Sequence, residues 1–211
     1  MRLGSIILAG GKSDRMGRPK ASLPFGDNTL LGRTVATLLS CTYPVVVVAR
    51  DARQVEEELP PVPVEADIIH DAEEHRGSGP LAGLLMGLGH VNDKCAAAFL
   101  TGCDVPFLTP AAVEWLAEQL GDHDLVMPEV SGVLQPLCGI YRTSIELAVR
   151  KLLASDDRSL HGLTGSTKAR VLTEAEVSAF DPSLRFLRGV NSPEEYQAAL
   201  REAGLSEADK A

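Results

Sequence analysis

The sequence predicts an α/β protein with a single domain built on a doubly wound, mostly parallel sheet. Short apolar segments rich in β-branched residues alternate with longer segments of helical periodicity. Several strand segments are apolar throughout, as expected where helices cover both faces of a sheet. The length of 211 residues fits one well-filled core, which we place at residues 1–204 with a polar C-terminal tail at 205–211.

Five segments in the first 130 residues are expected to form strands: 4–10, 44–50, 65–71, 96–104 and 123–129. Between them, apolar residues recur at spacings of three and four, which predicts helices. These helices are expected at 29–40, 51–59, 79–91 and 109–120. The last has clear ends, because Thr109 suits the N-cap, Pro110 the first turn, and Gly121 a stop.

The pattern changes after residue 130. The elements expected there are a strand over 132–142, a helix over 144–154, a short helix within 158–166 and, over 185–204, a strand, a turn and a closing helix. Asn191 or Ser192 would cap the closing helix. The tail from Leu205 is polar, and we expect it to fray.

The charge balance argues against two classes of partner. With 20 Lys and Arg against 29 Asp and Glu, the net charge is −9, so nucleic acid and anionic membrane surfaces would repel the chain. No apolar run approaches the roughly 20 residues of a membrane span, and no secretory signal precedes the first strand. The 4 cysteines lack C-x-x-C spacing, so we expect reduced, mostly buried thiols in a cytoplasmic protein.

The first strand runs into a loop with an unusual density of cations, ILAGGKSDRMGRPK at residues 7–20. Its charged residues are Lys12, Asp14, Arg15, Arg18 and Lys20. A concentrated cation cluster on an acidic protein favours a local anion site, although a solvated loop of mixed charge is the alternative. In an open α/β sheet such a loop lies outside the carboxyl ends of the strands, where ligands bind.

Two familiar nucleotide motifs are excluded by spacing. A P-loop ending at Gly11-Lys12-Ser13 needs a glycine where the chain has Ile6, and adjacent glycines break the G-x-G-x-x-G pattern. The remaining feature is a glycine turn whose backbone N–H groups could approach an anion closely. Arg15 and Lys20 could then bind phosphate oxygens.

An acidic residue is expected at the same edge of the sheet. Asp104 follows the apolar strand at 96–104, and Pro106 fixes the chain just after it. A carboxylate beside phosphates would weaken their binding unless a cation such as Mg²⁺ lay between them, and Mg²⁺ uses one or two carboxylates plus substrate phosphates. An aspartate that starts a turn is the simpler reading of Asp104 alone; together with the cationic loop, metal binding is favoured.

The segment at 70–83 contains further candidates. His70 and His75 are five residues apart, which does not match a zinc helix. The small residues from Gly79 to Gly83 could let a flat base lie against the backbone, or could serve tight helix packing. No nucleophile elbow or catalytic triad is present, which favours a reaction in which a phosphate attacks and the protein supplies positioning and charge neutralisation.

Taken together, these stretches resemble the nucleotidyltransferases of molybdenum-cofactor biosynthesis, most closely the molybdenum cofactor guanylyltransferases. The matching segments, in family order, are Leu8-Ala9-Gly10-Gly11-Lys12, Arg15-Met16-Gly17, Pro19-Lys20, Asp71, Gly79-Pro80-Leu81-Ala82-Gly83, Cys103-Asp104-Val105-Pro106-Phe107, Gln135-Pro136-Leu137 and Val190-Asn191-Ser192-Pro193-Glu194-Glu195. They span nearly the whole chain.

The resemblance implies a three-layer α/β/α nucleotidyltransferase fold with a Rossmann-like central sheet. It also implies transfer of GMP from GTP to the terminal phosphate of Mo-molybdopterin, with Mg²⁺ as cofactor and release of pyrophosphate. By the same resemblance the nucleotide would be bound by Leu8, Ala9, Gly10, Gly11, Lys20, Asp71, Gly79, Pro80, Leu81 and Asp104. Asp104 and Asn191 would hold the metal, and Arg15, Lys20 and Asp104 would be catalytic. Proteins of molybdenum insertion and molybdoenzyme maturation are the expected partners.

The chain departs from the family pattern at two places. The family usually has an asparagine after the second strand, where this chain has Val48-Ala49-Arg50-Asp51, and its C-terminal Asn-x-Asn is here Gly189-Val190-Asn191. Gly10 favours guanine, because cytidylyl relatives tend to have alanine there. The alternatives are a cytidylyltransferase for the same cofactor, a sugar-phosphate nucleotidyltransferase, and a non-catalytic carrier of nucleotide or cofactor. Arg158, Lys168 and Arg170 are candidate cations for the pterin.

Overall fold

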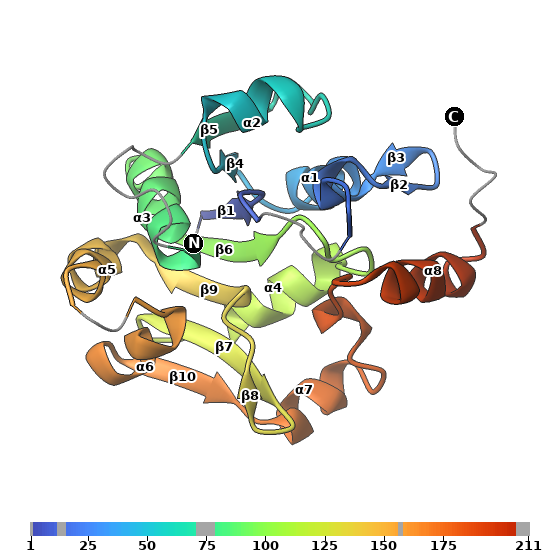
Figure 1. Ribbon diagram of the computed structural model, residues 1–211. Helices are drawn as coiled ribbons and strands as arrows, with labels where there is room; N and C mark the ends of the chain where they lie inside the picture. Colours follow the sequence, from blue (N-terminus) through green and yellow to red (C-terminus); the bar gives the residue numbers. More distant parts are fainter. Residues whose placement is uncertain (1, 12–15, 71–78, 156–157, 206–211) are drawn as a thin grey trace.

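The computed structural model describes residues 2–11, 16–70, 79–155 and 158–205. Within these residues one large sheet forms the middle layer, with helices on both of its faces (Figure 1). Its strands, in chain order, are β1 (Leu3–Leu8), β4 (Val45–Ala49), β5 (Ala66–His70), β6 (Ala97–Gly102), β7 (Leu125–Val130), β8 (Val133–Leu134), β9 (Cys138–Arg142) and β10 (Ala169–Leu172). The expected α/β fold is confirmed.

The strand order across the sheet is β10-β7-β9-β6-β1-β4-β5, with β8 paired to β7. β1 lies between β6 and β4 and is parallel to both, β5 is parallel to β4, and β10 is parallel to β7. The antiparallel pairs involve β9, which lies between β6 and β7, and the short β8. Because β6, β1 and β4 are parallel neighbours, the loops at their carboxyl ends lie side by side.

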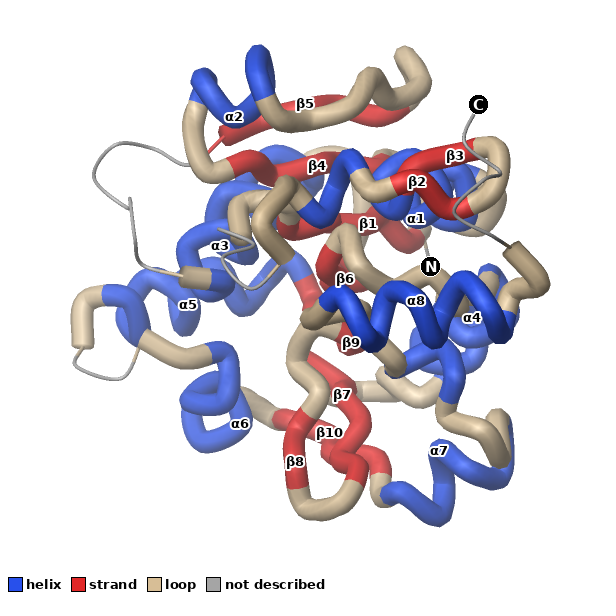
Figure 2. Tube along the Cα trace, turned by 45° about the vertical axis from the view of Figure 1, so that its right-hand side comes forward, coloured by secondary structure: helices blue, strands red, loops and turns tan. Residues whose placement is uncertain are grey.

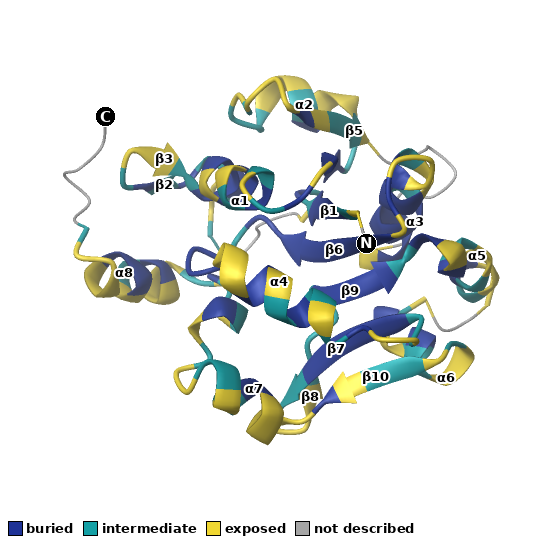
Figure 3. Cartoon of the chain, turned by 180° about the vertical axis from the view of Figure 1, so that it is seen from behind, coloured by how far each residue is buried: buried dark blue, intermediate teal, exposed yellow. Residues whose placement is uncertain are grey.

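The helices are α1 (Leu30–Leu39), α2 (Ala52–Glu57), α3 (Pro80–Val91), α4 (Pro110–Glu118), α5 (Glu146–Leu153), α6 (Leu163–Ser166), α7 (Glu174–Phe180) and α8 (Pro193–Glu202). Short 3-10 turns are η1 (Lys20–Ser22), η3 (Thr143–Ile145), η4 (Leu160–Gly162) and η5 (Arg185–Leu187). α1, α4 and α7 pack on one face of the sheet, and α3, α5 and α6 on the other. In Figure 3 the helices show exposed outer faces, whereas the middle strands are buried.

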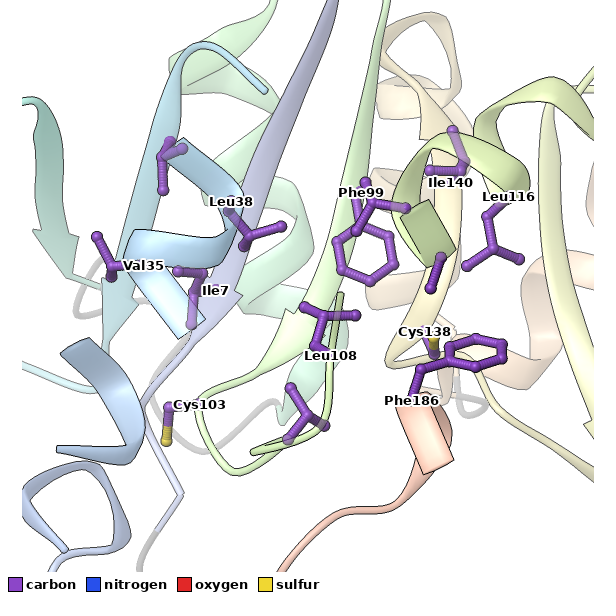
Figure 4. Packing of buried hydrophobic residues seen from close by; sticks show 14 of the residues in the cluster. Ile7, Val35, Leu38, Phe99, Cys103, Leu108, Leu116, Cys138, Ile140 and Phe186 are labelled. Atoms are coloured by element: carbon purple, nitrogen blue, oxygen red, sulfur yellow. The ribbon is translucent and has the colours of Figure 1, made fainter. Parts of the chain in front are cut away.

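The strands are buried on both faces because their residues alternate between two cores. Ile7 and Phe99 belong to the core under α1 and α4 (Figure 4), whereas their neighbours Ile6 and Leu100 belong to the core under α3 and α5. All four side chains are fully buried. A third, smaller cluster joins α8 to a two-stranded hairpin formed by β2 (Pro24–Phe25) and β3 (Asn28–Thr29).

Helix starts follow the sequence signals. Thr109 caps α4, accepting a hydrogen bond from the N–H of Ala112, and Pro110 occupies the first turn as expected. Ser192 caps α8 by accepting from the N–H of Glu195, so Ser192 rather than Asn191 fills this role. Asn191 is thereby available for another function.

The region after residue 130 differs from the expectation in three ways. The segment 132–142 is two strands, β8 and β9, interrupted around Pro136, which has no N–H to donate to a ladder. Residues 185–187 form the turn η5 instead of a strand. β10 and α7 were not expected, because each is short.

The burial of the cysteines and of Leu205 can also be compared with the expectation. Cys95, Cys103 and Cys138 are buried free thiols and Cys41 is partly buried, as expected. Leu205 was expected to belong to the frayed tail, but it packs against the third hydrophobic cluster. Among the described residues no helix is long and apolar enough to cross a membrane.

Candidate functional site

A cavity of about 590 Å³ opens over the carboxyl ends of β6, β1 and β4. Its wall contains most of the residues predicted to bind nucleotide or metal: Leu8, Ala9, Gly10, Gly11, Lys20, Gly79, Pro80, Asp104 and Asn191. The volume is within the range of ordinary small-molecule sites. Segments from the two ends of the chain therefore meet here, and Figure 2 shows α8 close to β6.

The glycine turn after β1 has its backbone fixed from below. The N–H of Ala9 donates to the carbonyl of Val48 at 2.9 Å, and the side-chain amide of Gln54 donates to the carbonyl of Ala9 at 2.7 Å. By contrast, the N–H groups of Gly10 and Gly11 donate to no described residue. They lie in the cavity wall with no partner among the described residues, which is the arrangement that a phosphate requires.

Glycine at position 10 allows a close approach of two backbone segments. A Cβ there would lie 3.2 Å from the backbone nitrogen of Arg50, so the turn after β1 and the end of β4 nearly touch. At Gly11 a Cβ would meet nothing within 4 Å, because this residue faces open space. The first glycine therefore serves packing, and the second leaves the cavity unobstructed.

Lys20 forms the centre of the polar part of the site. It begins the short turn η1, and its ammonium donates to Asp104 Oδ2 at 2.8 Å and to Asn191 Oδ1 at 2.8 Å. The side chains of Lys20 and Asp104 are 17% and 21% exposed, so their ion pair is partly shielded from water. Residues that are 84 and 171 positions apart in sequence thus meet at one nitrogen atom.

The neighbouring backbone fixes Asp104 and Asn191. A Cβ at Gly102 would lie 2.6 Å from Asp104 Oδ1, so the carboxylate occupies the space that a side chain at the end of β6 would need. The carbonyl of Asp104 accepts from the N–H of Val190 at 2.9 Å, and the N–H of Asn191 donates to Glu195 at 2.6 Å. The loop after β6 and the loop before α8 are therefore joined directly.

The donor set fits a hard divalent cation. Asp104 Oδ2 and Asn191 Oδ1 both contact one positively charged nitrogen, so two oxygen atoms already converge on a cation. Among the described residues no group of three or more acidic, His or Cys side chains could hold a metal by itself. Mg²⁺ needs no such group, since it completes its shell with substrate phosphates and water.

The start of α3 forms another wall of the cavity. The backbone at position 79 has a φ of 70°, a left-handed conformation that favours glycine. Pro80 occupies the first turn of the helix. A Cβ at Gly83 would lie 2.7 Å from a methyl group of Leu8, so this glycine serves close packing of α3 on β1. Leu81 is buried in the core and does not line the cavity, so any nucleotide contact would have to involve its backbone.

Two polar residues in the described cavity wall, Gln54 and Arg50, were not predicted to belong to the site. Gln54 is 2% exposed and joins Ala9 to the N–H of Arg50, and Arg50 forms ion pairs with Asp51 and Glu58 at 3.3 and 2.9 Å. Arg50 stands in the segment where the family asparagine was expected. Gln54 gave no sequence signal, because a glutamine in a polar helix ordinarily faces solvent.

The remaining candidates are either outside the described residues or away from the cavity. Arg15 and Asp71, together with Lys12 and most of the segment around His75, fall outside the described residues. Lys168 pairs with Asp122, and Arg170 donates to the carbonyl of Gln119 at 2.8 Å and pairs with Glu176. Neither cation lines the cavity, and nor does the exposed Arg158, so the structure does not group these three cations with the site.

Cys103, the one thiol in the described part of the cavity wall, is a poor nucleophile. Burial, followed by the nearby charge of Asp104, raises the pKa of Cys103 to about 12. Because a thiolate is the reactive form, Cys103 stays protonated and inert at neutral pH. The described part of the site therefore offers cation binding and backbone donors, without an activated side-chain nucleophile.

Comparisons with known proteins agree with this chemistry. The family model of the MobA-like NTP transferase domain matches residues 5–172. A probable molybdenum cofactor guanylyltransferase of Bacillus mycoides is 29% identical over 199 residues, which cover 93% of this chain and 95% of the relative. Another, from Carboxydothermus hydrogenoformans, is 31% identical over 202 residues, covering 95% and 96%.

The fold also has solved counterparts. The crystal structure of molybdopterin-guanine dinucleotide biosynthesis protein A from Archaeoglobus fulgidus superposes with a TM-score of 0.77 at 22% identity, covering 97% of this chain and 99% of that chain. At that identity the likeness shows the shared fold.

Proposed function

Because this chain belongs to the MobA-like NTP transferase family, we propose that it transfers GMP from GTP to molybdopterin carrying molybdenum. A terminal phosphate oxygen of the pterin attacks the α-phosphorus of GTP, and a new phosphorus–oxygen bond forms. The bond from the α-phosphorus to the α,β-bridging oxygen breaks, and pyrophosphate leaves. The product is a molybdopterin guanine dinucleotide.

The observation that carries this proposal is the meeting of Lys20, Asp104 and Asn191 beside the glycine turn in one cavity. A triphosphate needs backbone donors and a cationic group, and a bound metal needs oxygen ligands at the same place. The turn supplies the N–H groups of Gly10 and Gly11, Lys20 supplies the charge, and the other two residues supply oxygen atoms. Catalysis by positioning and charge neutralisation suits nucleotidyl transfer.

The orientation of GTP follows from the order of the strands. The phosphates lie near β6 and β1, where Lys20 and Asp104 are, and the base lies toward β4 and the start of α3. Adjacent strands are about 4.8 Å apart, so the ends of β6 and β4 are separated by roughly 10 Å, a span comparable to that of a nucleotide. The proposed position of the base is beside Gly79 and Pro80, which line the same cavity as Gly10 and Arg50.

The roles of the individual residues are electrostatic. Lys20 binds the α-phosphate and stabilises the negative charge that develops as the bond to the leaving group lengthens. Arg15 of the same loop is proposed to assist from the leaving-group side. Asp104 and Asn191 would hold Mg²⁺, which, when bound, neutralises charge on the triphosphate. Asp71 is proposed to contact the nucleoside.

The proposal extends to location and partners. Free thiols in the core suit a reducing compartment, and we therefore place the activity in the cytoplasm. Its product would pass to proteins that mature molybdoenzymes, and its substrate would come from proteins that insert molybdenum.

Release of pyrophosphate tests the base and the acceptor together. The rate should be highest with GTP, lower with CTP and UTP, and dependent on added molybdopterin. A preference for CTP would assign the chain to the cytidylyltransferases. Nucleotide binding without any pyrophosphate release would favour a carrier protein.

The variant Asp104→Ala tests the polar site. Turnover should be abolished, while GTP binding in EDTA remains measurable because the glycine turn and Lys20 are intact. Asp122→Ala, which removes an exposed carboxylate paired with Lys168, is the control and should keep wild-type turnover. Unchanged turnover in Asp104→Ala would remove this residue from the mechanism.

A further inference from the structure

A compact aromatic cluster lies next to the polar site. Phe107, which is 8% exposed, meets the ring of Phe25 edge to face, with centroids 6.1 Å apart at an angle of 87°. The guanidinium groups of Arg185 and Arg188 lie 4.6 and 4.7 Å from the centroid of the Phe107 ring. We call Phe107 and these three contacting residues the Phe107 cluster.

Each polar residue of the site is close in sequence to residues that pack in or beside this cluster. Lys20 starts the turn η1, which leads through the buried Leu23 to Phe25. Asp104 lies three positions before Phe107 in the same loop. Asn191 directly follows Val190, which is 2% exposed and belongs to the same hydrophobic group as Phe25 and Phe107.

Glu202 adds a clamp on the exposed side. It pairs with Arg185 at 2.7 Å and also with Arg188, so one carboxylate on α8 holds both guanidinium groups over the ring. These contacts connect η5 and α8, which flank Asn191, to the loop that carries Asp104. Val190, whose N–H donates to the carbonyl of Asp104, lies in the segment between Arg188 and Glu202 that these ion pairs close.

We propose that Phe107 is a positioning residue that sets the distance between Asp104 and Asn191, and thereby the part of nucleotide affinity that depends on a divalent metal. The inference rests on the proposed function, in which these two residues hold the metal. Phe107 itself does not line the cavity, so it acts through the loops that it joins. Groups that hydrogen-bond directly to metal ligands commonly alter metal affinity about 10–100-fold when changed, and Phe107, which acts through loop packing, should have an effect at the low end of that range.

The test compares the dissociation constant of GTP in EDTA with that in Mg²⁺, measured by calorimetry on the full-length protein. In the wild type Mg²⁺ should tighten binding. Phe107→Leu keeps an apolar side chain but removes the ring face, and it should reduce this tightening about tenfold while the constant in EDTA stays within about twofold. A merely stabilising role would leave the ratio of the two constants unchanged.

Two further variants keep the test decisive. Glu202→Gln removes a partly exposed charge and should shift the ratio in the same direction, by less; if Phe107→Leu does not fold, this variant decides. Phe180→Leu is the matched control, because Phe180 stacks on Trp115 at 4.7 Å and, among the described residues, its one ring contact with η5 is to Phe186. Its ratio should equal that of the wild type.

The outcomes separate the two proposals. A wild-type ratio in folded Phe107→Leu, or in Glu202→Gln where that variant decides, overturns the positioning role and leaves the proposed function standing. An equal loss in Phe180→Leu also overturns it, because general loosening would then explain the effect. Absence of any Mg²⁺ effect in the wild type, or its persistence in Asp104→Ala, overturns the metal site of the proposed function and the inference with it.

Discussion

At the scale of single residues, the ammonium of Lys20 organises the site. It contacts a carboxylate oxygen and an amide oxygen at 2.8 Å each, so both are satisfied by one positive charge. A lysine is a compact point charge on a flexible stem, so the group can reach a phosphate without the fixed geometry that an arginine demands. The same side chain can therefore neutralise Asp104 and bind an anionic substrate.

Lys20→Ala should weaken GTP binding in EDTA by about 1.5–3 kcal/mol, because a charge-assisted contact to the triphosphate is lost. That corresponds to roughly a 10- to 150-fold rise in the dissociation constant, measurable by calorimetry. The control is Lys168→Ala, which removes an exposed lysine that also pairs with an aspartate, and it should bind GTP as the wild type does. Equal affinity in the two variants would mean that Lys20 makes no contact with the nucleotide.

At the scale of elements, helix α3 is positioned by glycines that have distinct roles. A Cβ at Gly87 would lie 2.5 Å from Ile6, a fully buried β-branched residue of β1, so the helix packs directly on the strand that leads into the site. Gly89, two residues later, is exposed and would meet nothing within 4 Å. The two glycines therefore offer a test of packing against helix propensity within one helix.

Gly87→Ala should lower the free energy of unfolding by about 1–3 kcal/mol, because overpacking outweighs the gain in helix propensity. Gly89→Ala should raise it by about 0.5–1 kcal/mol, because only the propensity changes. Urea unfolding followed by circular dichroism measures both values. If both substitutions stabilised the protein, the close packing of α3 on β1 would be wrong.

At the scale of the whole molecule, topology explains how much could be predicted. The continuously apolar run of β4 and the periodicity of α1 to α4 identified the sheet and its helices. Because parallel strands end at the same edge of a sheet, Lys20 and Asp104 could be predicted from the sequence to lie close together. The roles of Gln54 and the Phe107 cluster could not be predicted, because they depend on which groups from distant parts of the chain a side chain meets. β10 and α7 were missed because elements of four and seven residues are determined by tertiary packing.

The raised pKa values of the cysteine thiols should make the free energy of unfolding fall at alkaline pH. Burial raises the pKa of Cys103 to about 12, and burial followed by the charge of Glu114 raises that of Cys41 to about 11. Burial also raises the pKa values of Cys95 and Cys138. In the unfolded chain a thiol ionises near pH 8.5, so above this pH the unfolded state has lost protons that the folded state retains. Folding stability must therefore fall as pH rises from about 8.5 toward the folded-state values.

Removing one of these thiols should flatten that dependence by a known amount. Between about pH 9.5 and 11 each thiol that remains protonated only in the folded state contributes a slope of about 1.4 kcal/mol per pH unit. Urea unfolding of the reduced protein across this range should therefore show a slope for Cys103→Ala that is shallower than the wild-type slope by about this amount. The comparison of slopes is independent of any constant loss of packing that the substitution causes. Parallel curves would show that Cys103 ionises alike in both states, and that the loop carrying Asp104 is open to water.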